Sequence, residues 1–416
     1  MTIARRDFLR GAGLVSVAGL AQGSVAVAQQ HTALAESVGL DRFEFDPDKV
    51  PMNAANLCPM PGSVSQANSD IQASLDRDMS GANRNRFRDY REKARTRIAD
   101  LLGTHSDEIA LLRNTSEANN VIVRGLPLAT DDEVLLWDEN HPSNGIAWDV
   151  RAQRDGFRTR RFSVPRGLSS PDEVIAHITS HIGPKTRVVS FTHISNITGF
   201  RLPLAELCET VKKRGDIYIH VDGAQTWGAV DINLHDSGCD SFSASSHKWF
   251  MGPRETGILY VRDRHIGAIQ PLIVSLPWGN DIKTTNQGAR KFEALGQRDT
   301  AAMAALDAAV AYHEKMSPTV IERRSGTIAD YLREGLIELG LSFVSPLNPA
   351  FKSNVVILRG KREQLPELVD RILEDAGIIV APVNGLRLSP HVYNTADHVD
   401  RVVASIRKHR HLLPAV

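Results

Sequence analysis

The amino-acid sequence predicts an α/β fold with a mostly parallel central sheet, followed by a second, smaller α+β domain. Between about residues 109 and 261, short and nearly continuous apolar segments alternate with segments of helical pattern, which is typical of parallel strands buried on both faces. From about residue 300 the pattern changes to a long alanine-rich helix, short strands and two further helices. A chain of 416 residues is also too long for one ordinary core, which favours two domains.

Each element is expected where its own pattern starts and stops. An amphipathic helix over 84–102 should end at Gly103, and a helix over 204–215 should close on Gly215, because glycine is favoured just past a helix end. A helix over 170–178 carries proline in its first turn. Further strands are expected at 108–114, 133–140, 186–194, 217–224, 239–245, 256–262, 353–360, 377–383 and 386–394, and further helices at 115–126, 141–156, 300–316, 363–376 and 396–411.

Composition excludes several classes of function. With 49 basic and 49 acidic residues the formal net charge is zero, so no general attraction to nucleic acid or to an anionic membrane is expected. The arginine-rich segment 84–88 is interpreted as a solvated helix face. The three cysteines form no CxxC pair and the fifteen histidines show no metal-binding spacing, so we expect no metal site.

The first 28 residues have the order of an export signal. Arg5 and Arg6 are followed by Phe8-Leu9, a mildly apolar Gly/Ala-rich run and the small-x-small sequence Ala26-Val27-Ala28, a pattern that resembles a twin-arginine signal. We therefore expect residues 1–28 to engage the twin-arginine translocation machinery, and the processed protein to be periplasmic and free of the membrane. An arm should follow over 29–60, then a large domain over 61–299 and a small domain over 300–416.

Polar residues gather where the predicted strands end, which is the edge at which open parallel sheets bind ligands. Asp222 ends an apolar strand, and Lys248 follows the next strand 26 residues later. Taken singly, the other residues have ordinary structural explanations, since a Thr/Ser cap or a lone histidine is more often structural. These residues are Thr115, Ser116, His141, Asn196, Gln225, Ser245 and His247.

In combination these residues suit pyridoxal phosphate. This cofactor needs a lysine amine for its aldehyde, a carboxylate for its pyridine nitrogen, donors for its phosphate and a flat side chain against its ring. Lys248, Asp222, a helix start at residues 115–118 and His141 supply these groups in one order along the chain. A cofactor that must be loaded before export would also explain the use of the twin-arginine route.

The segments TSEA, ENHPSN, SNITG, VDGAQ and SSHKWFMGP resemble motifs of the class V aminotransferase family of fold-type I pyridoxal phosphate enzymes. The resemblance runs from about Asn53 to Arg407 and implies a seven-stranded, mostly parallel sheet in the large domain. It implies Lys248 as the Schiff-base lysine, Asp222 on the pyridine nitrogen, and Arg387 on the substrate α-carboxylate. It further implies ring contacts from His141, Asn196 and Gln225, and phosphate contacts from Thr115, Ser116, Ser245 and His247.

Within this family the chain is similar to the isopenicillin N epimerase-like branch, through GQRDTAA at 296–302 and RLSPHVYNT at 387–395. Cysteine desulfurases carry a catalytic cysteine just before the carboxylate arginine, whereas residues 380–386 contain none. Gln297 stands where the branch commonly has a threonine that reaches the neighbouring subunit's phosphate. The family builds its active site at a subunit interface, so a homodimer is expected.

The expected function is that of an exported enzyme acting at the α-carbon of an amino acid or amino-acid-derived compound, of aminotransferase or epimerase type. Exported relatives in this branch include a periplasmic enzyme that tailors pyoverdine siderophores, and the chain is similar in design. Two alternatives stay open: a C–S lyase that works without a catalytic cysteine, and a non-catalytic periplasmic binding protein on the same scaffold.

Overall fold

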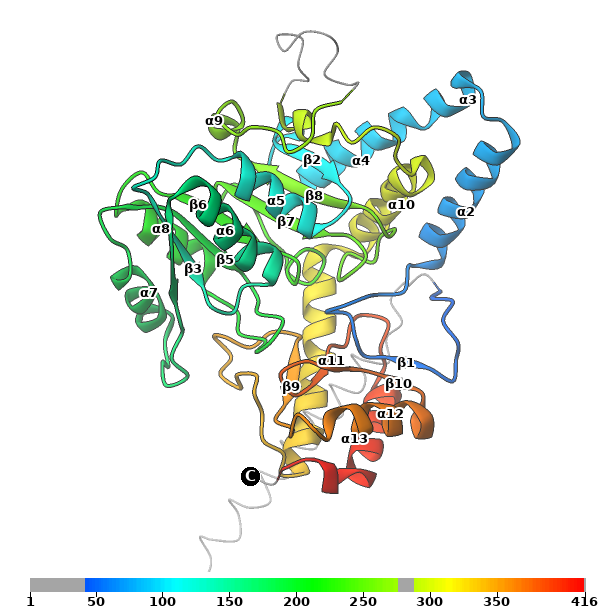
Figure 1. Cartoon of the computed structure of the whole chain (residues 1–416). Coiled ribbons are helices and arrows are strands. Elements are labelled where there is room, and N and C mark those ends of the chain that lie inside the picture. The colour runs from blue at the N-terminus through cyan, green and yellow to red at the C-terminus, as the bar shows by residue number, and fades with distance from the viewer. Residues whose placement is uncertain (1–41, 276–287, 415–416) are drawn as a thin grey trace, which may run out of the picture.

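A seven-stranded sheet forms the centre of the larger part of the molecule (Figure 1). The computed structural model describes residues 42–275 and 288–414, so the export segment expected over 1–28 lies outside the described residues. The strand order is β2-β8-β7-β6-β5-β3-β4. Of these strands β8 alone runs antiparallel to its neighbours, which confirms the expected α/β fold. The strands are β2 Ile109–Leu112, β3 Glu133–Trp137, β4 Arg158–Phe162, β5 Thr186–Thr192, β6 Tyr218–Asp222, β7 Ser241–Ser245 and β8 Gly257–Val261.

The two faces of this sheet are covered by different helices, because alternate strand residues point to opposite sides. On β2, Ile109 and Leu111 belong to one core with α4 (Arg88–Leu101), α7 (Pro171–Ser180), α8 (Leu204–Lys212) and α10 (Thr300–Met316). Ala110 and Leu112 belong to a second core with α5 (Thr115–Gly125), α6 (Pro142–Asp155) and α9 (Asp263–Ile266). Burial on both faces explains why these strands are nearly continuous apolar runs.

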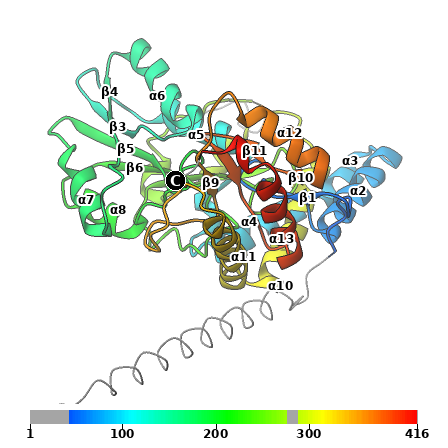
Figure 2. The same ribbon diagram turned by 90° about the horizontal axis from the view of Figure 1, so that it is seen from below.

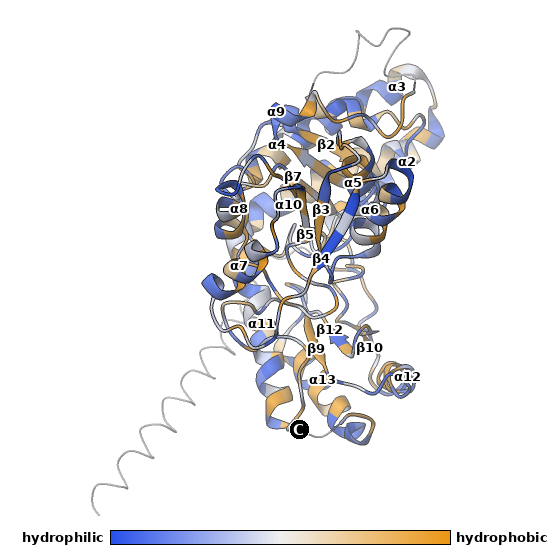
Figure 3. Cartoon of the chain, turned by 60° about the vertical axis from the view of Figure 1, so that its left-hand side comes forward, coloured by the Kyte–Doolittle hydropathy of each residue, from blue (hydrophilic) through white to orange (hydrophobic). Residues whose placement is uncertain are grey.

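The edge strand β4 was not expected from the sequence, because its sequence RTRRF is mostly charged. Figure 3 shows β4 in the hydrophilic colour beside the apolar inner strands. Arginines on an edge strand discourage pairing with another chain, so the missing apolar pattern follows from the position of the strand.

The N-terminal helical region differs from the single helix predicted over 84–102. The structure has α2 (Gly62–Arg77), which was not predicted, then α3 (Gly81–Arg86) and α4 (Arg88–Leu101). Phe87 separates α3 from α4, and the Ser80 hydroxyl accepts a hydrogen bond from the backbone N–H of Asn83 to start α3. The predicted end at Gly103 is confirmed, since this residue takes a φ of 62° directly after α4.

The smaller part of the molecule has its own core around the antiparallel sheet β11-β12-β9. Its strands are β9 Val356–Leu358, β10 Ile378–Ile379, β11 Ala381–Pro382 and β12 Leu386–Leu388. Its helices are α11 (Pro318–Glu338), which was not predicted, α12 (Leu365–Ala376) and α13 (Ala396–Lys408). In Figure 2 these three helices gather around the small sheet.

Two segments pack against a different core from the one that their place in the sequence suggests. Helix α10 follows residue 300, yet Met303 and Leu306 belong to the core of the large sheet. Strand β1 (Val50–Pro51) pairs with β10, and Val50 and Met52 belong to the core of the small sheet. The N-terminal segment and the α10–α11 connection therefore both cross between the two cores (Figure 1). No helix among the described residues is long and apolar enough to cross a membrane.

Candidate active site

The carboxyl ends of five parallel strands open at one edge of the large sheet. Strands β2, β3, β5, β6 and β7 point the same way, so the segments that follow them meet at this edge. These segments carry the residues singled out in the sequence: Thr115 and Ser116, His141, Asn196, Asp222 and Gln225, and Ser245 to Lys248.

Asp222 is buried at the end of β6, with 1% of its surface exposed. Its Oδ2 accepts a hydrogen bond from Asn119 Nδ2 at 2.8 Å, and its Oδ1 accepts one from the backbone N–H of Ala224 at 3.0 Å. Among the described residues, no cationic group lies within ion-pair distance of this carboxylate. A buried carboxylate without a cation is costly unless a positively charged or protonated group completes the site.

Asn119, on the inner face of α5, organises a buried polar network behind Asp222. Because its Nδ2 donates to Asp222, its Oδ1 must be an acceptor, and it receives hydrogen bonds from the Ser243 hydroxyl and from His220 Nε2. His220 Nδ1 then accepts from the Ser241 hydroxyl at 2.8 Å. Burial lowers the pKa of His220 to about 3, so this histidine is neutral and fixes Asn119 without adding charge.

Lys248 follows β7 on a turn that is closed by backbone hydrogen bonds. The carbonyl of Lys248 accepts from the N–H of Met251, which takes a φ of 52°. Among the described residues, no acceptor bonds the Lys248 amine. Burial lowers the pKa of Lys248, while the charge of Asp222 acts in the opposite direction and that of Arg387 adds to the lowering. The amine therefore lies within electrostatic reach of both residues and loses its proton more readily than an exposed lysine.

Thr115 and Ser245 form the expected cluster of hydroxyl and amide donors. The backbone N–H of Thr115 donates to the Ser245 hydroxyl at 2.7 Å, and the two hydroxyl oxygens also lie 2.7 Å apart. Thr115 is not the N-cap that the sequence suggested. Asn114 caps α5 through its side chain, which accepts from the N–H of Glu117, and the Thr115 hydroxyl bonds Ser245 instead of capping the helix. Ser116 is exposed at the same helix start.

The pKa values of the two site histidines are both lowered, which favours their neutral forms. Burial lowers the pKa of His247 to about 4, and the charges of Lys248 and Arg254 add to the effect. His141 begins α6, where its Nδ1 accepts from the N–H of Ser143 at 3.3 Å. Partial burial lowers the pKa of His141, opposed by the charge of Asp222. The His141 side chain is otherwise exposed, so its ring is open to a ligand.

Arg387 lies on β12 of the small sheet and faces the site from the opposite core. It is 4% exposed, and its Nη1 and Nη2 donate to the Asn196 carbonyl at 3.1 Å and to Asn53 Oδ1 at 3.2 Å. Its Nε is buried without an acceptor, and among the described residues no carboxylate pairs with it. Burial lowers the pKa of Arg387 to about 10. An unpaired buried guanidinium is poised for an anionic ligand.

Gln225 is engaged by protein groups. Its Nε2 donates to the Ala55 carbonyl at 3.0 Å, and its Oε1 accepts from Trp249 Nε1 at 2.7 Å. The residue therefore fixes the ring of Trp249 beside Lys248. Asn196 likewise contributes its backbone carbonyl to Arg387.

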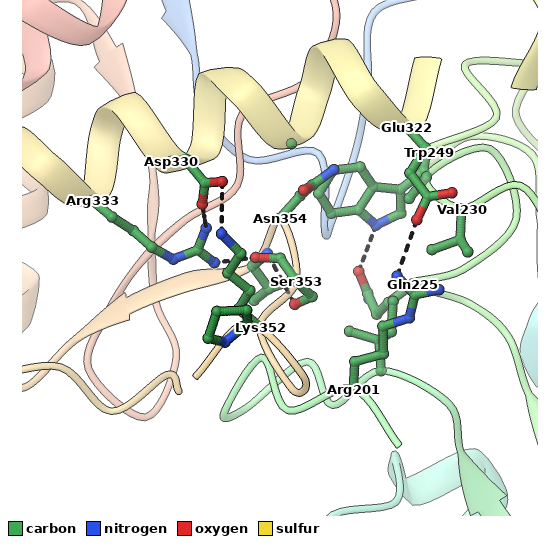
Figure 4. Close-up of a pocket in the computed structure, with 15 residues that line it drawn as sticks. Arg201, Gln225, Val230, Trp249, Glu322, Asp330, Arg333, Lys352, Ser353 and Asn354 are labelled. Atoms are coloured by element: carbon green, nitrogen blue, oxygen red, sulfur yellow. Dashed lines mark hydrogen bonds and ion pairs between the residues drawn. The ribbon is translucent and has the colours of Figure 1, made fainter. Parts of the chain in front are cut away.

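A cavity of about 180 Å³ lies behind Gln225 and Trp249, between the large sheet and α11 (Figure 4). Figure 4 shows ion pairs across it, which join α11 to the large domain and to the segment before β9. The pairs are Arg201–Glu322 at 3.0 Å and Lys352–Asp330 at 2.7 Å. The cavity therefore lies between the two cores, is bridged by these ion pairs, and shares Gln225 and Trp249 with the strand-end site.

Cys58 lies closer to the site than its sequence position suggested. Its backbone N–H donates to the His247 carbonyl at 2.9 Å. The thiol is buried against the Tyr393 hydroxyl, and burial raises its pKa to about 12. The thiolate is the reactive form of cysteine, so Cys58 is a poor nucleophile. Among the described residues, no cluster of three or more His, Cys, Asp or Glu side chains could hold a metal ion.

Sequence reasoning missed Asn53, Asn119, His220 and His391 as parts of the site. Asn119 could have been noticed as an amide on the otherwise apolar face of α5. Asn53 and His391 carry no local signal, because Asn53 reaches Arg387 only after the N-terminal segment has paired with the small domain, and His391 reaches the Trp249 carbonyl across the junction of the two cores.

Comparison with known proteins identifies the family. The profile of the family described as aminotransferase class V matches residues 63–402. The chain belongs to the class V aminotransferase family. The isopenicillin N epimerase of Streptomyces clavuligerus is 28% identical over 382 residues, covering 88% of this chain and 96% of that protein. The corresponding enzyme of Amycolatopsis lactamdurans is 30% identical over 340 residues, covering 76% and 84%.

Other class V relatives are similar at a comparable level. A probable cysteine desulfurase of Xylella fastidiosa (strain Temecula1) is 29% identical over 349 residues, covering 77% of this chain and 80% of that protein. Among solved structures, a cystine C-S lyase in complex with cysteine persulfide has a TM-score of 0.79 at 23% identity, covering 87% of this chain and 98% of that one. This likeness supports the fold alone.

The class V enzyme described here is pyridoxal phosphate-dependent. Its residues fit the cofactor on three observations made above. Asp222 is a buried carboxylate that lacks a cation, Lys248 has an amine without an acceptor, and Arg387 has an orphaned N–H. Asp222 and Lys248 come from the large domain and Arg387 from the small domain, and the charges of Asp222 and Arg387 both act on the Lys248 amine. A pyridinium nitrogen, an aldehyde carbon and a substrate carboxylate would complete them in that order.

Proposed function

We propose that this class V enzyme acts at the α-carbon of an amino acid or amino-acid-derived substrate, as an aminotransferase or an epimerase. The observation that carries the proposal is Arg387, a buried guanidinium without a carboxylate partner that faces Lys248 from the small domain. A ligand that brings both an amine to Lys248 and a carboxylate to Arg387 is an α-amino acid.

Each residue of the site has a separate task in this proposal. Bound pyridoxal phosphate supplies an electron sink that acidifies the α-hydrogen. Asp222, aligned by Asn119, would pair with the ring nitrogen of the cofactor and stabilise its protonated form. Thr115 and Ser245 present an amide and two hydroxyls for the phosphate, and His141 offers its open ring for stacking.

Lys248 is the base that would move the α-proton. Its amine has a lowered pKa, so a larger fraction is neutral and able to accept a proton than for an exposed lysine. Arg387 would fix the α-carboxylate and thereby orient the α-hydrogen toward the Lys248 Nζ. Return of a proton to the α-carbon on the opposite face would give the epimer, whereas delivery of the proton to the cofactor carbon that carries the amino nitrogen would lead to a keto acid.

The names of the relatives support an epimerase or transferase more than a desulfurase. The isopenicillin N epimerases match most of the chain. A cysteine desulfurase needs a reactive thiol, and each of the three cysteines is buried with a raised pKa. C–S lysis without a protein thiol would use the same Lys248 and Arg387, so product analysis must separate it.

The decisive experiment is a hydrogen-exchange screen. The holoenzyme is incubated in D₂O with individual amino acids and with siderophore-derived amino acids, and loss of the α-proton signal is followed by NMR. We expect exchange with at least one amino acid, with loss of exchange in Lys248→Ala and retention in the exposed control Lys213→Ala. Formation of a keto acid, of the opposite enantiomer, or of pyruvate with sulfide then assigns transamination, epimerisation or C–S lysis. Absence of exchange with every amino acid would refute the proposal and favour a binding protein.

We also propose that the enzyme is exported through the twin-arginine pathway and acts as a periplasmic homodimer. The Arg5-Arg6 signal supports export. Ile146 and Val150, exposed one turn apart on α6 just after His141, support a subunit contact beside the site. Changing Arg5 and Arg6 to lysine should retain the protein in the cytoplasm, and light scattering should give twice the chain mass. Periplasmic accumulation of the lysine variant would contradict export by this route, and a monomeric mass would contradict the dimer.

A further inference from the structure

The cavity beside α11 contains charged groups that have no task in the proposed chemistry at Lys248. Neither Lys248 nor Arg387 lines it, although Gln225 and Trp249 belong both to it and to the strand-end site. Figure 4 shows its charged side chains on α11 and on two segments that face this helix. The side chains that form its apolar wall are Ile194, Ala229, Val230, Pro349 and Val355.

The charged groups of this cavity leave one positive charge in excess. Three of the lining residues are cations and two are anions. Glu322 accepts from Arg201 Nη1 at 3.0 Å through one oxygen and from a backbone N–H at 2.8 Å through the other. Asp330 accepts from Arg333 Nη1 at 2.9 Å and from Lys352 Nζ at 2.7 Å. Both carboxylates therefore have each oxygen engaged, and neither is left to balance the third cation.

Arg333 carries a buried donor that no group in the described part of the chain accepts. The residue is 5% exposed, and its Nε has no hydrogen-bond partner there. Its Nη1 and Nη2 are used, since they bond Asp330 and the Ser353 carbonyl. Burial lowers the pKa of Arg333, and the charge of Asp330 opposes this effect only in part. Buried donors are ordinarily satisfied by protein, water or ligand, and Arg333 lines the cavity, so the cavity is the place for the missing acceptor.

Gly326 keeps the α11 wall of the cavity open. It lies in the interior of this helix, where glycine is less favourable than alanine. A Cβ at this position would meet Asn354 Oδ1 at 3.9 Å and nothing closer, and the φ angle is not positive, so neither packing nor backbone conformation requires glycine. Gly335 of the same helix differs, because a Cβ there would lie 2.8 Å from Val403 Cγ2. The open space at Gly326 therefore has a cost in helix stability that the packing of α11 does not explain.

We propose that this cavity is a second binding site, for a small aliphatic carboxylate whose carboxyl group accepts from Arg333 Nε and whose body packs against Ile194 and Val230. A carboxylate carries one negative charge and only acceptors, which match the excess positive charge and the unused donor. Its body is limited to a few carbon atoms, because about 180 Å³ equals the volume of about six water molecules in the liquid. The bound molecule would contact Trp249, the residue that follows Lys248, so the site adjoins the catalytic segment without using its lysine.

The test is isothermal titration calorimetry of the holoenzyme with butyrate and with butyramide, which share a body and differ in charge. We expect saturable binding of butyrate, with one site per chain that remains in Arg387→Met, and weaker binding of butyramide. Affinity for butyrate should fall at least about tenfold, the loss that corresponds to one hydrogen bond to a charged group, in Arg333→Gln. It should fall as much in Gly326→Leu, which places a side chain in the cavity. It should be unchanged in the matched control Arg323→Gln, an exposed arginine of the same helix.

The Arg387→Met variant separates this cavity from the strand-end site. Loss of butyrate binding in Arg387→Met, together with full binding in Gly326→Leu, would overturn the proposal, because butyrate would then lie at the strand ends and the role proposed for Arg387 would stand. The proposal is also wrong if butyramide binds as tightly as butyrate, or if Arg323→Gln loses as much affinity as Arg333→Gln. Absence of binding of both compounds to the wild type would likewise overturn it and leave the cavity to water. Leucine favours a helix over glycine, so Gly326→Leu serves even if Arg333→Gln does not fold.

Discussion

Replacement of Arg387 by methionine tests the central feature of the proposed function. This arginine bonds the Asn196 carbonyl and Asn53 Oδ1, and its Nε has no acceptor among the described residues. Burial lowers its pKa to about 10, against an ordinary value near 12.5, so the buried charge costs about 3 kcal/mol. Methionine removes that cost but leaves two acceptors unpaired at about 1–3 kcal/mol each. The unfolding free energy should therefore fall by no more than about 3 kcal/mol.

The effect on substrate should be much larger. Loss of a buried, hydrogen-bonded charge pair costs about 2–5 kcal/mol, which is about 30-fold to several thousand-fold in kcat/KM. Arg387→Lys keeps the positive charge but loses the paired N–H groups of the guanidinium. Loss of one charged hydrogen bond should lower kcat/KM by about 10- to 150-fold. The matched control is Arg359→Met, an exposed arginine just after β9 of the same sheet.

The assay compares an amino acid that the wild type accepts with the amine formed by removing its carboxyl group. If Arg387 binds the α-carboxylate, the variant loses activity on the amino acid while its weak activity on the amine is retained. Equal losses for both compounds would refute this reasoning, because they would show that Arg387 only positions the surrounding chain.

Three further predictions concern the buried polar groups. Asn119→Ala leaves Asp222 Oδ2 and His220 Nε2 without partners. We therefore expect a free energy of unfolding, measured in urea, that is about 2–4 kcal/mol lower, and weaker cofactor binding. The control Asn120→Ala, on the outer face of the same helix, should show neither effect. The three cysteines should resist Ellman's reagent at pH 8 and all react in denaturant, since a pKa of about 12 for Cys58 leaves roughly one thiolate in 10⁴; rapid reaction of a native thiol would contradict this. Stability should fall between pH 6.5 and 5, by about 1.4 kcal/mol per pH unit for each buried histidine. The unfolded chain binds protons there that the folded chain excludes, and a flat urea midpoint over this range would contradict the lowered pKa values of His193, His220, His313 and His391.

The sequence predicted those parts of the fold whose burial is regular along the chain. Strands β2, β3, β5, β6, β7 and β8 and helices α5 to α8 were expected near their observed positions, because apolar runs and helix caps are local signals. The charged edge strand β4 carries no apolar run. Helix α11 was missed because its sequence is interrupted by charge, and its apolar side faces a core that is completed by distant segments.

The candidate site was predictable to a different extent. Asp222 ends β6 and Lys248 follows β7, which pairs with β6 in parallel, so their convergence follows from topology once the sheet is recognised. The engagement of Gln225 with Ala55 and Trp249 does not follow. This contact depends on where the N-terminal segment lies after it has paired with the small domain, and no local sequence pattern encodes that position.

Neutral hydrogen bonds hold the three charged residues of the site in place. After Lys248, the Trp249 carbonyl accepts from His391 Nε2 at 2.7 Å and the Phe250 carbonyl from His313 Nε2 at 2.9 Å. His391 Nδ1 accepts from the N–H of Val392, which places the His391 proton on Nε2. Burial lowers the pKa of His391 to about 4 and that of His313 to about 3, so neither adds charge. Ion pairs at these positions would compete with ligand charges for Lys248, Asp222 and Arg387. Because these hydrogen bonds are neutral, they add no charge of their own beside Lys248.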